Sequence, residues 1–109
     1  LPAHHEETGT LRGQVVWIDR FGNCITNLTD RVVSRWAGGT SFTVLTALKR
    51  IAGISTNYES TPEGEALALI NSMGYLEVAC NLARADSVLG LREGDPVVLE
   101  KAPTGEGRP

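Results

Sequence analysis

Seven short segments rich in aliphatic and β-branched residues, each bounded by turn-forming residues, follow one another along this 109-residue chain. Such close spacing of short apolar runs and turn signals is typical of antiparallel β-structure. We predict strands at residues 11–18, 25–28, 41–45, 49–54, 66–70, 75–81 and 96–101. A small chain avoids exposed sheet edges best by closing its sheet, so a barrel is favoured over a sandwich. The predicted fold class is all-β, a small closed antiparallel β-barrel of about seven strands.

One or two short helices are predicted between the strands. The segment 30–36 has Asp30 as a candidate N-cap, and Gly38 and Gly39 follow it as a stop signal. Residues 83–89 form a second candidate helix, ended by Gly90.

In the first strand, alternate residues are expected to share one face, namely Leu11, Gly13, Val15 and Trp17.

The length indicates a single domain with one hydrophobic core. Residues 1–10 are mostly polar and have no periodicity, so we expect a linker or leader there. Residues 11–101 should form the barrel, and residues 102–109 a disordered tail. His4, His5, Glu6 and Glu7 could be drawn as a metal cluster, but a solvated flexible leader is favoured because the neighbouring residues offer nothing to pack against.

The composition excludes several classes of function. With 41% apolar and 21% charged residues, the chain has the balance of a globular protein. A net charge of −3 gives no basic surface for nucleic acid. No apolar run is long enough to cross a bilayer and the N-terminus carries no secretory signal, so we expect no membrane partner and a cytoplasmic location. In that compartment Cys24 and Cys80 are expected to be reduced, partly buried thiols.

Two stretches, residues 18–27 and 71–81, hold more polar side chains, glycines and aromatics than ordinary turns need. Four carboxamides can donate and accept hydrogen bonds there: Asn23, Asn27, Asn71 and Asn81. Phe21 and Tyr58 can stack on a flat ring, so the combination suits a purine. A simpler interpretation stays open, in which Asp19 and Asn23 hold the backbone around Gly22 and Tyr58 is a rim residue.

Nothing in the sequence indicates that the chain performs chemistry by itself. No nucleophile, base and orienting group occur together, and both histidines lie in the leader. We therefore expect no catalytic residue, no metal and no cofactor.

The two stretches resemble motifs of the S-adenosyl-L-methionine (SAM) hydroxide adenosyltransferases, the adenosine-forming SAM hydrolases related to fluorinase and chlorinase. From Asp19 to Asn27 the chain is similar to their Asp-x-Phe-Gly-Asn-x-x-Thr-Asn motif. From Asn71 to Asn81 it is similar to their Asn-Ser-x-Gly-x-Leu-Glu-x-Ala-x-Asn motif. The likeness covers residues 13 to about 99 and is to the C-terminal domain of that family only.

This resemblance implies a two-domain enzyme that converts SAM and water into adenosine and methionine. An N-terminal α/β domain of one subunit and the C-terminal barrel of the next would form each active site in a homotrimer. The implied substrate-binding residues are Asp19 and Ser72 for the methionine moiety, Asn23 and the backbone near Asn81 and Leu82 for the adenine edge, Tyr58 for stacking on the base, Phe21 for the wall, and Met73, which follows Ser72. Met73 and Cys80 stand where related halogenases carry arginines, and with Glu77 this favours hydrolysis.

Two hypotheses follow for the function. In the first, the chain is the substrate-binding C-terminal domain of a SAM hydrolase, inactive alone because the groups that activate water belong to the absent N-terminal domain. In the alternative, it is a stand-alone non-catalytic barrel that binds a nucleotide-like ligand or a protein partner. The first hypothesis further expects five residues to cluster on one side of the barrel: Asp19, Asn23, Tyr58, Ser72 and Asn81.

Overall fold

The computed structural model describes residues 2–56 and 61–102. Its strands are β1 (His5–Glu6), β2 (Thr10–Ile18), β3 (Cys24–Thr29), β4 (Phe42–Leu45), β5 (Arg50–Ala52), β6 (Ala66–Ile70), β7 (Tyr75–Cys80) and β8 (Pro96–Lys101). The helices of the described residues are α1 (Asp30–Ala37) and α2 (Ala85–Leu89). Each predicted strand and helix is therefore confirmed, and β1 is an additional strand.

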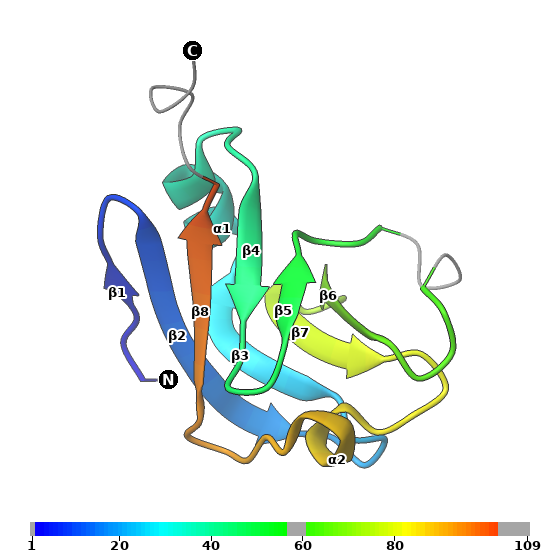
Figure 1. Ribbon diagram of the computed structural model, residues 1–109. Coiled ribbons are helices and arrows are strands. Elements are labelled where there is room, and N and C mark those ends of the chain that lie inside the picture. The colour runs from blue at the N-terminus through cyan, green and yellow to red at the C-terminus, as the bar shows by residue number, and fades with distance from the viewer. Residues whose placement is uncertain (1, 57–60, 103–109) are drawn as a thin grey trace.

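The strands form one antiparallel sheet that wraps into a nearly closed barrel (Figure 1). The strand order is β5-β4-β8-β2-β3-β7-β6, and β1 pairs with β2 outside this path. The seam lies between β5 and β6. Just after β5, the backbone N–H of Ser55 donates to the carbonyl of Ala68 on β6 at 2.7 Å, which links the two sides of the seam. The predicted antiparallel barrel is thus confirmed.

A bulge in β2 changes the face that Trp17 occupies. Val15 pairs with Thr26 and Trp17 pairs with Ile25, so two steps along β2 match one step along β3. Val15 is fully buried, whereas 59% of Trp17 is exposed. The prediction that Trp17 shares a face with Val15 is wrong, because one extra residue in a strand reverses the alternation beyond it.

Thr29, not Asp30, caps the first helix. Thr29 has an extended backbone, and its hydroxyl oxygen accepts a hydrogen bond from the backbone N–H of Val32 at 3.1 Å. Asp30 is the first helical residue, where its negative charge is favourable near the helix N-terminus. Thr and Asp are both good caps, so residue types alone did not separate these neighbouring positions. The helix ends at Gly38, as predicted.

The hydrophobic core fills the barrel between the two helices, which lie at opposite ends of it (Figure 1). Helix α1 buries Val33 and Trp36, and helix α2 buries Ala85 and Leu89. The strands contribute fully buried side chains that include Leu11, Val15, Leu28, Val44, Leu76, Val78, Val97 and Leu99. Within residues 2–56 and 61–102, neither helix combines the length and the apolar character needed to cross a membrane.

The leader packs against the barrel, contrary to the expectation of a solvated flexible segment. Strand β1 pairs with β2, with His5 opposite Arg12 and Glu6 opposite Leu11. The side chains of β1 stay exposed, and the backbone makes the attachment. Backbone pairing needs no apolar side chain, so the polar composition of the leader did not reveal it. The predicted tail is described only at residue 102, and residues 103–109 lie outside the described part.

Candidate functional site

The first motif forms the turn between β2 and β3, and Asp19 organises it. Oδ1 of Asp19 accepts hydrogen bonds from the backbone N–H groups of Phe21 and Asn23 at 2.9 and 3.0 Å. Its Oδ2 accepts from Nδ2 of Asn23 at 3.0 Å. Gly22 takes φ of 85°, a conformation that favours glycine. Asp19 and Asn23 therefore do hold the backbone around Gly22, and any ligand contact would be additional to that role.

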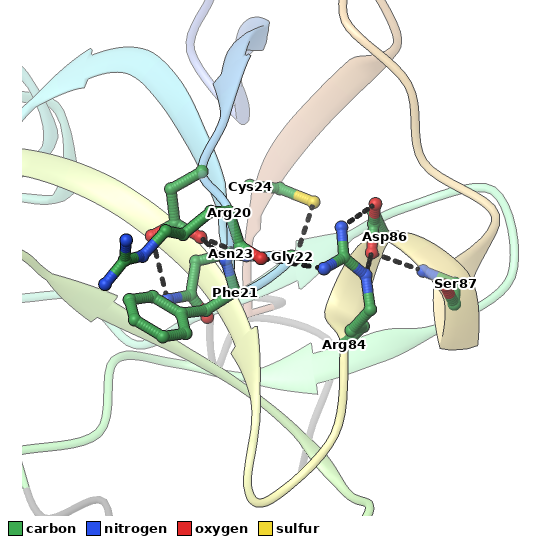
Figure 2. A network of polar contacts seen from close by, with 9 residues as sticks. Arg20, Phe21, Gly22, Asn23, Cys24, Arg84, Asp86 and Ser87 are labelled. Atoms are coloured by element: carbon green, nitrogen blue, oxygen red, sulfur yellow. Dashed lines mark hydrogen bonds and ion pairs between the residues drawn. The ribbon is translucent and has the colours of Figure 1, made fainter.

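Residues 84–86 form hydrogen bonds to the backbone of this turn, as Figure 2 shows. Arg84 donates from Nη1 to the carbonyl of Arg20 at 2.8 Å, and from Nε and Nη2 to the two carboxylate oxygens of Asp86 at 3.1 and 3.0 Å. The backbone N–H of Asp86 donates to the carbonyl of Gly22 at 3.0 Å. The bonds from Arg84 hold the pKa of Asp86 below its usual value. Our sequence reasoning missed Arg84 and Asp86, because no local signal marks a contact between segments so far apart.

Asn71 organises the turn between β6 and β7 in a similar way. Its Oδ1 accepts from the backbone N–H groups of Met73 and Tyr75 at 3.0 and 3.1 Å. Its Nδ2 donates to Oε1 of Glu77 at 3.1 Å. Because two N–H donors face Oδ1, the orientation of the carboxamide is fixed, and Glu77 must receive its N–H. Ser72 and Met73 stand exposed at the tip of this turn.

Strands β3 and β7 bring the two motifs side by side. Cys24 lies opposite Val78, and both belong to the core. Their neighbours Ile25 and Glu77 also lie opposite each other, and they face the outside of the barrel because alternate side chains point to opposite faces. Only 9% of Glu77 is exposed. This burial raises the pKa of Glu77, and the hydrogen bond from Asn71 acts in the opposite direction.

Two open hollows lie next to this pair of strands, and each is lined by residues of both motifs. The first is lined by Phe21, Asn23, Cys80, Asn81, Leu82, Ala83 and Arg84. The second has a volume of about 290 Å³ and is lined by Val16, Trp17, Ile25, Thr26, Asn71, Met73 and Tyr75. The convergence of both motifs on each hollow makes this outer surface the candidate site.

The backbone at the end of β7 is fixed by residues 61–65. The N–H of Asn81 donates to the carbonyl of Glu65 at 3.1 Å, and its carbonyl accepts from the N–H of Gly64 at 2.7 Å. Its Nδ2 donates to the carbonyl of Thr61 at 2.7 Å. Leu82 then has φ of 58° and is the one non-glycine residue with positive φ in the described part of the chain. That conformation costs about 1–2 kcal/mol, and such strain is concentrated at functional sites.

The predicted substrate-binding residues fall into two groups. The first hollow contains Phe21, Asn23, Asn81 and Leu82. Met73 lines the second hollow, Ser72 is next to it on the exposed turn, and Asp19 lies within the turn of the first motif. Tyr58 lies outside the described residues. Ser72 precedes the start of β7 and Asn81 follows its end, so the predicted residues extend along the length of this strand.

Both cysteines are buried free thiols, as predicted. Burial, together with nearby carboxylates, raises the pKa of Cys24 to about 12, so its thiol stays protonated at neutral pH and is a poor nucleophile. Among residues 2–56 and 61–102, no three His, Cys, Asp or Glu side chains converge in a way that could hold a metal ion.

Comparison with known proteins connects this surface to a family. The sequence profile of the SAM hydroxide adenosyltransferase C-terminal domain matches residues 13–98. A protein of Thermus thermophilus named (R)-S-adenosyl-L-methionine hydrolase is 38% identical over 89 residues, which make up 80% of this chain and 31% of that protein. The chain thus spans about a third of the length of this curated relative.

Two solved structures have a similar fold over most of the chain. An uncharacterized conserved protein from Thermotoga maritima superposes with a TM-score of 0.76 at 27% identity, covering 91% of this chain and 39% of that one. A conserved hypothetical protein from Thermus thermophilus gives a TM-score of 0.66 at 36% identity, covering 81% of this chain and 34% of that one. With both motifs inside the matched residues 13–98, the chain belongs to the SAM hydroxide adenosyltransferase C-terminal domain family.

Proposed function

We propose that this chain is the substrate-binding C-terminal domain of a SAM hydrolase, which converts SAM and water into adenosine and methionine. Family membership and the name of the Thermus thermophilus relative support this reaction. The chain spans 31% of that relative, and an N-terminal α/β domain would supply the rest of the active site. Each site would lie between that domain of one subunit and the barrel of the next in a homotrimer.

The observation that carries the proposal is the convergence of the two motifs on the paired strands β3 and β7. At the first hollow, Asn23 and the left-handed backbone of Leu82 would read the adenine edge. At the other end of β7, Ser72 and the turn around it would hold the methionine moiety. An elongated surface suits a ligand that has a flat base at one end and an amino acid at the other, as SAM has.

The exposed apolar side chains around both hollows support a partner domain. The exposed fractions are 59% for Trp17, 62% for Phe21, and 78% for both Met73 and Leu82. Large apolar side chains gathered on a surface indicate that a ligand or another protein surface covers them. A second wall contributed by an α/β domain would bury these side chains and exclude water from the substrate.

In this proposal the barrel binds and orients the substrate, and the chemistry takes place at its edge. Water, losing a proton to a base of the partner domain, attacks the ribose C5′ as the C5′–sulfur bond breaks and its electron pair stays on the sulfur of methionine. Asp19 already accepts three N–H bonds, and its remaining carboxylate lone pairs would receive the substrate ammonium group, so that the methionine moiety extends from the turn of the first motif towards Ser72. Because the base that accepts the proton of water belongs to the partner domain, the 109-residue chain alone is expected to be inactive.

Adenosine release from SAM by the full-length protein tests the proposal. We expect release by the full-length protein and none by the isolated 109-residue chain. In the full-length protein, Asn23→Ala should weaken SAM binding about five- to hundredfold, since losing a buried hydrogen-bond partner costs about 1–3 kcal/mol. Glu93→Ala, on an exposed turn, is the matched surface control and should leave binding unchanged.

A different result would favour the alternative function. If the full-length protein binds a nucleotide or a protein but releases no adenosine, the chain is a non-catalytic binding barrel. If Asn23→Ala folds normally and binds SAM as tightly as the parent, Asn23 is turn structure only and its role at the adenine edge is refuted.

A further inference from the structure

The edge of β2 that faces away from β8 is shared by two other strands. Strand β3 pairs with the C-terminal half of β2 and ends its pairing at Val15, which lies opposite Thr26. Strand β1 pairs with the N-terminal half, at Leu11 and Arg12. Gln14 lies between these two pairings and has no strand partner on this edge of β2 within the described part of the chain. Its backbone N–H needs another acceptor, because buried backbone groups are almost always paired.

The side chain of Asn27 fills this gap and binds the leader at the same time. Its Oδ1 accepts from the backbone N–H of Gln14 at 2.9 Å, and its Nδ2 donates to the carbonyl of Pro2 at 2.8 Å. Only 6% of Asn27 is exposed. A carbonyl partner on one side and an N–H partner on the other fix the orientation of the carboxamide. Gly13 makes room for it, since a Cβ there would lie 2.6 Å from Oδ1.

Further contacts hold the leader downstream of Pro2. The backbone N–H of Glu7 donates to the carbonyl of Thr10 at 2.9 Å, which closes the turn between β1 and β2. Nε1 of Trp36 on α1 donates to the carbonyl of Glu7 at 3.1 Å. The leader is thus bound at both ends, by Asn27 near its start and by Trp36 near its end.

We propose that Asn27 is a positioning residue: by joining β2 to the leader, it fixes the direction in which the chain enters the barrel. The sequence grouped Asn27 with carboxamides that could contact a ligand, but its amide is occupied by backbone groups on both sides. If the proposed function holds, Asn27 also helps to place the α/β domain that precedes the barrel; this step rests on the proposed function. A loosened leader would misalign the second wall of the substrate site without touching the substrate.

Amide hydrogen exchange of the 109-residue chain tests the attachment itself. In Asn27→Asp, one oxygen still accepts from Gln14, but the donor to Pro2 is lost and a carboxylate oxygen faces a carbonyl oxygen. We expect the amides of β1 and of Glu7 to exchange at least tenfold faster, while the amides of β3 and β7 keep their protection. Gln14→Glu is the matched control: it makes the same change of amide to carboxylate, and the backbone N–H at this position remains.

A chain that begins at His4 provides a second test, because it lacks the carbonyl of Pro2 and leaves Asn27 intact. It should show the same faster exchange in the leader even if Asn27→Asp does not fold. Unchanged leader protection in this shortened chain, or in a folded Asn27→Asp variant, would overturn the proposal.

The positioning role of Asn27 is tested by measuring the KM for SAM in the full-length protein. Asn27→Asp should raise the KM for SAM about tenfold, and Gln14→Glu should not. A freed leader with unchanged KM refutes the positioning role. If the parent protein releases no adenosine, the proposed function fails, and the exchange experiment still decides whether Asn27 holds the leader.

Discussion

Replacing Gly22 with alanine tests how closely residues 84–86 pack against the turn of the first motif. Gly22 has φ of 85°, and a Cβ built on it would lie 2.6 Å from Oδ1 of Asp86 and 2.7 Å from Cβ of Arg84. It would also lie 3.0 Å from the backbone Cα of Arg84, which cannot rotate away. The substitution therefore combines backbone strain with steric overlap.

Gly74, in the turn of the second motif, separates these two contributions. It has nearly the same backbone, with φ of 86°, and nothing lies within 4 Å of a Cβ built there. A left-handed conformation at a non-glycine residue costs about 1–2 kcal/mol, and overpacking adds about 1–3 kcal/mol. We therefore expect Gly74→Ala to reduce the free energy of unfolding by about 1–2 kcal/mol, and Gly22→Ala by about 2–5 kcal/mol.

Urea unfolding of the two variants and the parent chain measures this difference. The denaturant dependence of the unfolding free energy should stay the same, so that a change of midpoint reports stability. A difference of about 2 kcal/mol corresponds to roughly 8–16 °C in Tm for a domain of this size. Equal losses in both variants would show that residues 84–86 are not packed against Gly22, contrary to the arrangement in Figure 2.

Three further predictions concern buried polar groups. Thr26→Val removes the hydroxyl that donates to the carbonyl of Leu76 at 2.8 Å, and it should lower the unfolding free energy by about 1–3 kcal/mol in chemical denaturation; no loss would contradict the bond. Burial raises the pKa of Cys24 from 9.0 to about 12, so the contribution of its protonated thiol to stability is complete below pH 9 and is lost as the pH rises from 9 towards 12. Cys24→Ala should flatten this alkaline decline of the unfolding free energy. An unchanged decline would refute the raised pKa of Cys24. Burial raises the pKa of Glu77 above 4.5, so the charged carboxylate destabilises the fold at pH 7. Glu77→Gln, which still accepts from Asn71, should therefore stabilise the fold at pH 7 and lose this advantage as the pH falls towards 4.5; greater stability of the parent at pH 7 would contradict this.

The sequence predicted the strands well because each one is defined locally, by a short apolar run between turn residues. It was less accurate where two neighbouring positions are chemically equivalent, as with Thr29 and Asp30 at the start of α1. It was also misled at Trp17, because a bulge depends on the partner strand and leaves no mark in the alternation of the bulged strand itself. The attachment of β1 was missed because backbone pairing does not depend on side-chain polarity.

For the candidate site, the sequence by itself determined the chemical inventory. The two motifs, their carboxamides and the turn glycines are all readable from residue types and spacing, and so is the family resemblance. Only the tertiary structure decided how they combine: β3 and β7 pair, Asn71 bonds to Glu77, and residues 84–86 lie against Gly22. It also assigned Asn27 to the leader. The physical reason is that local conformational preferences follow from neighbouring residues, whereas contacts between distant segments depend on how the whole sheet closes around its core.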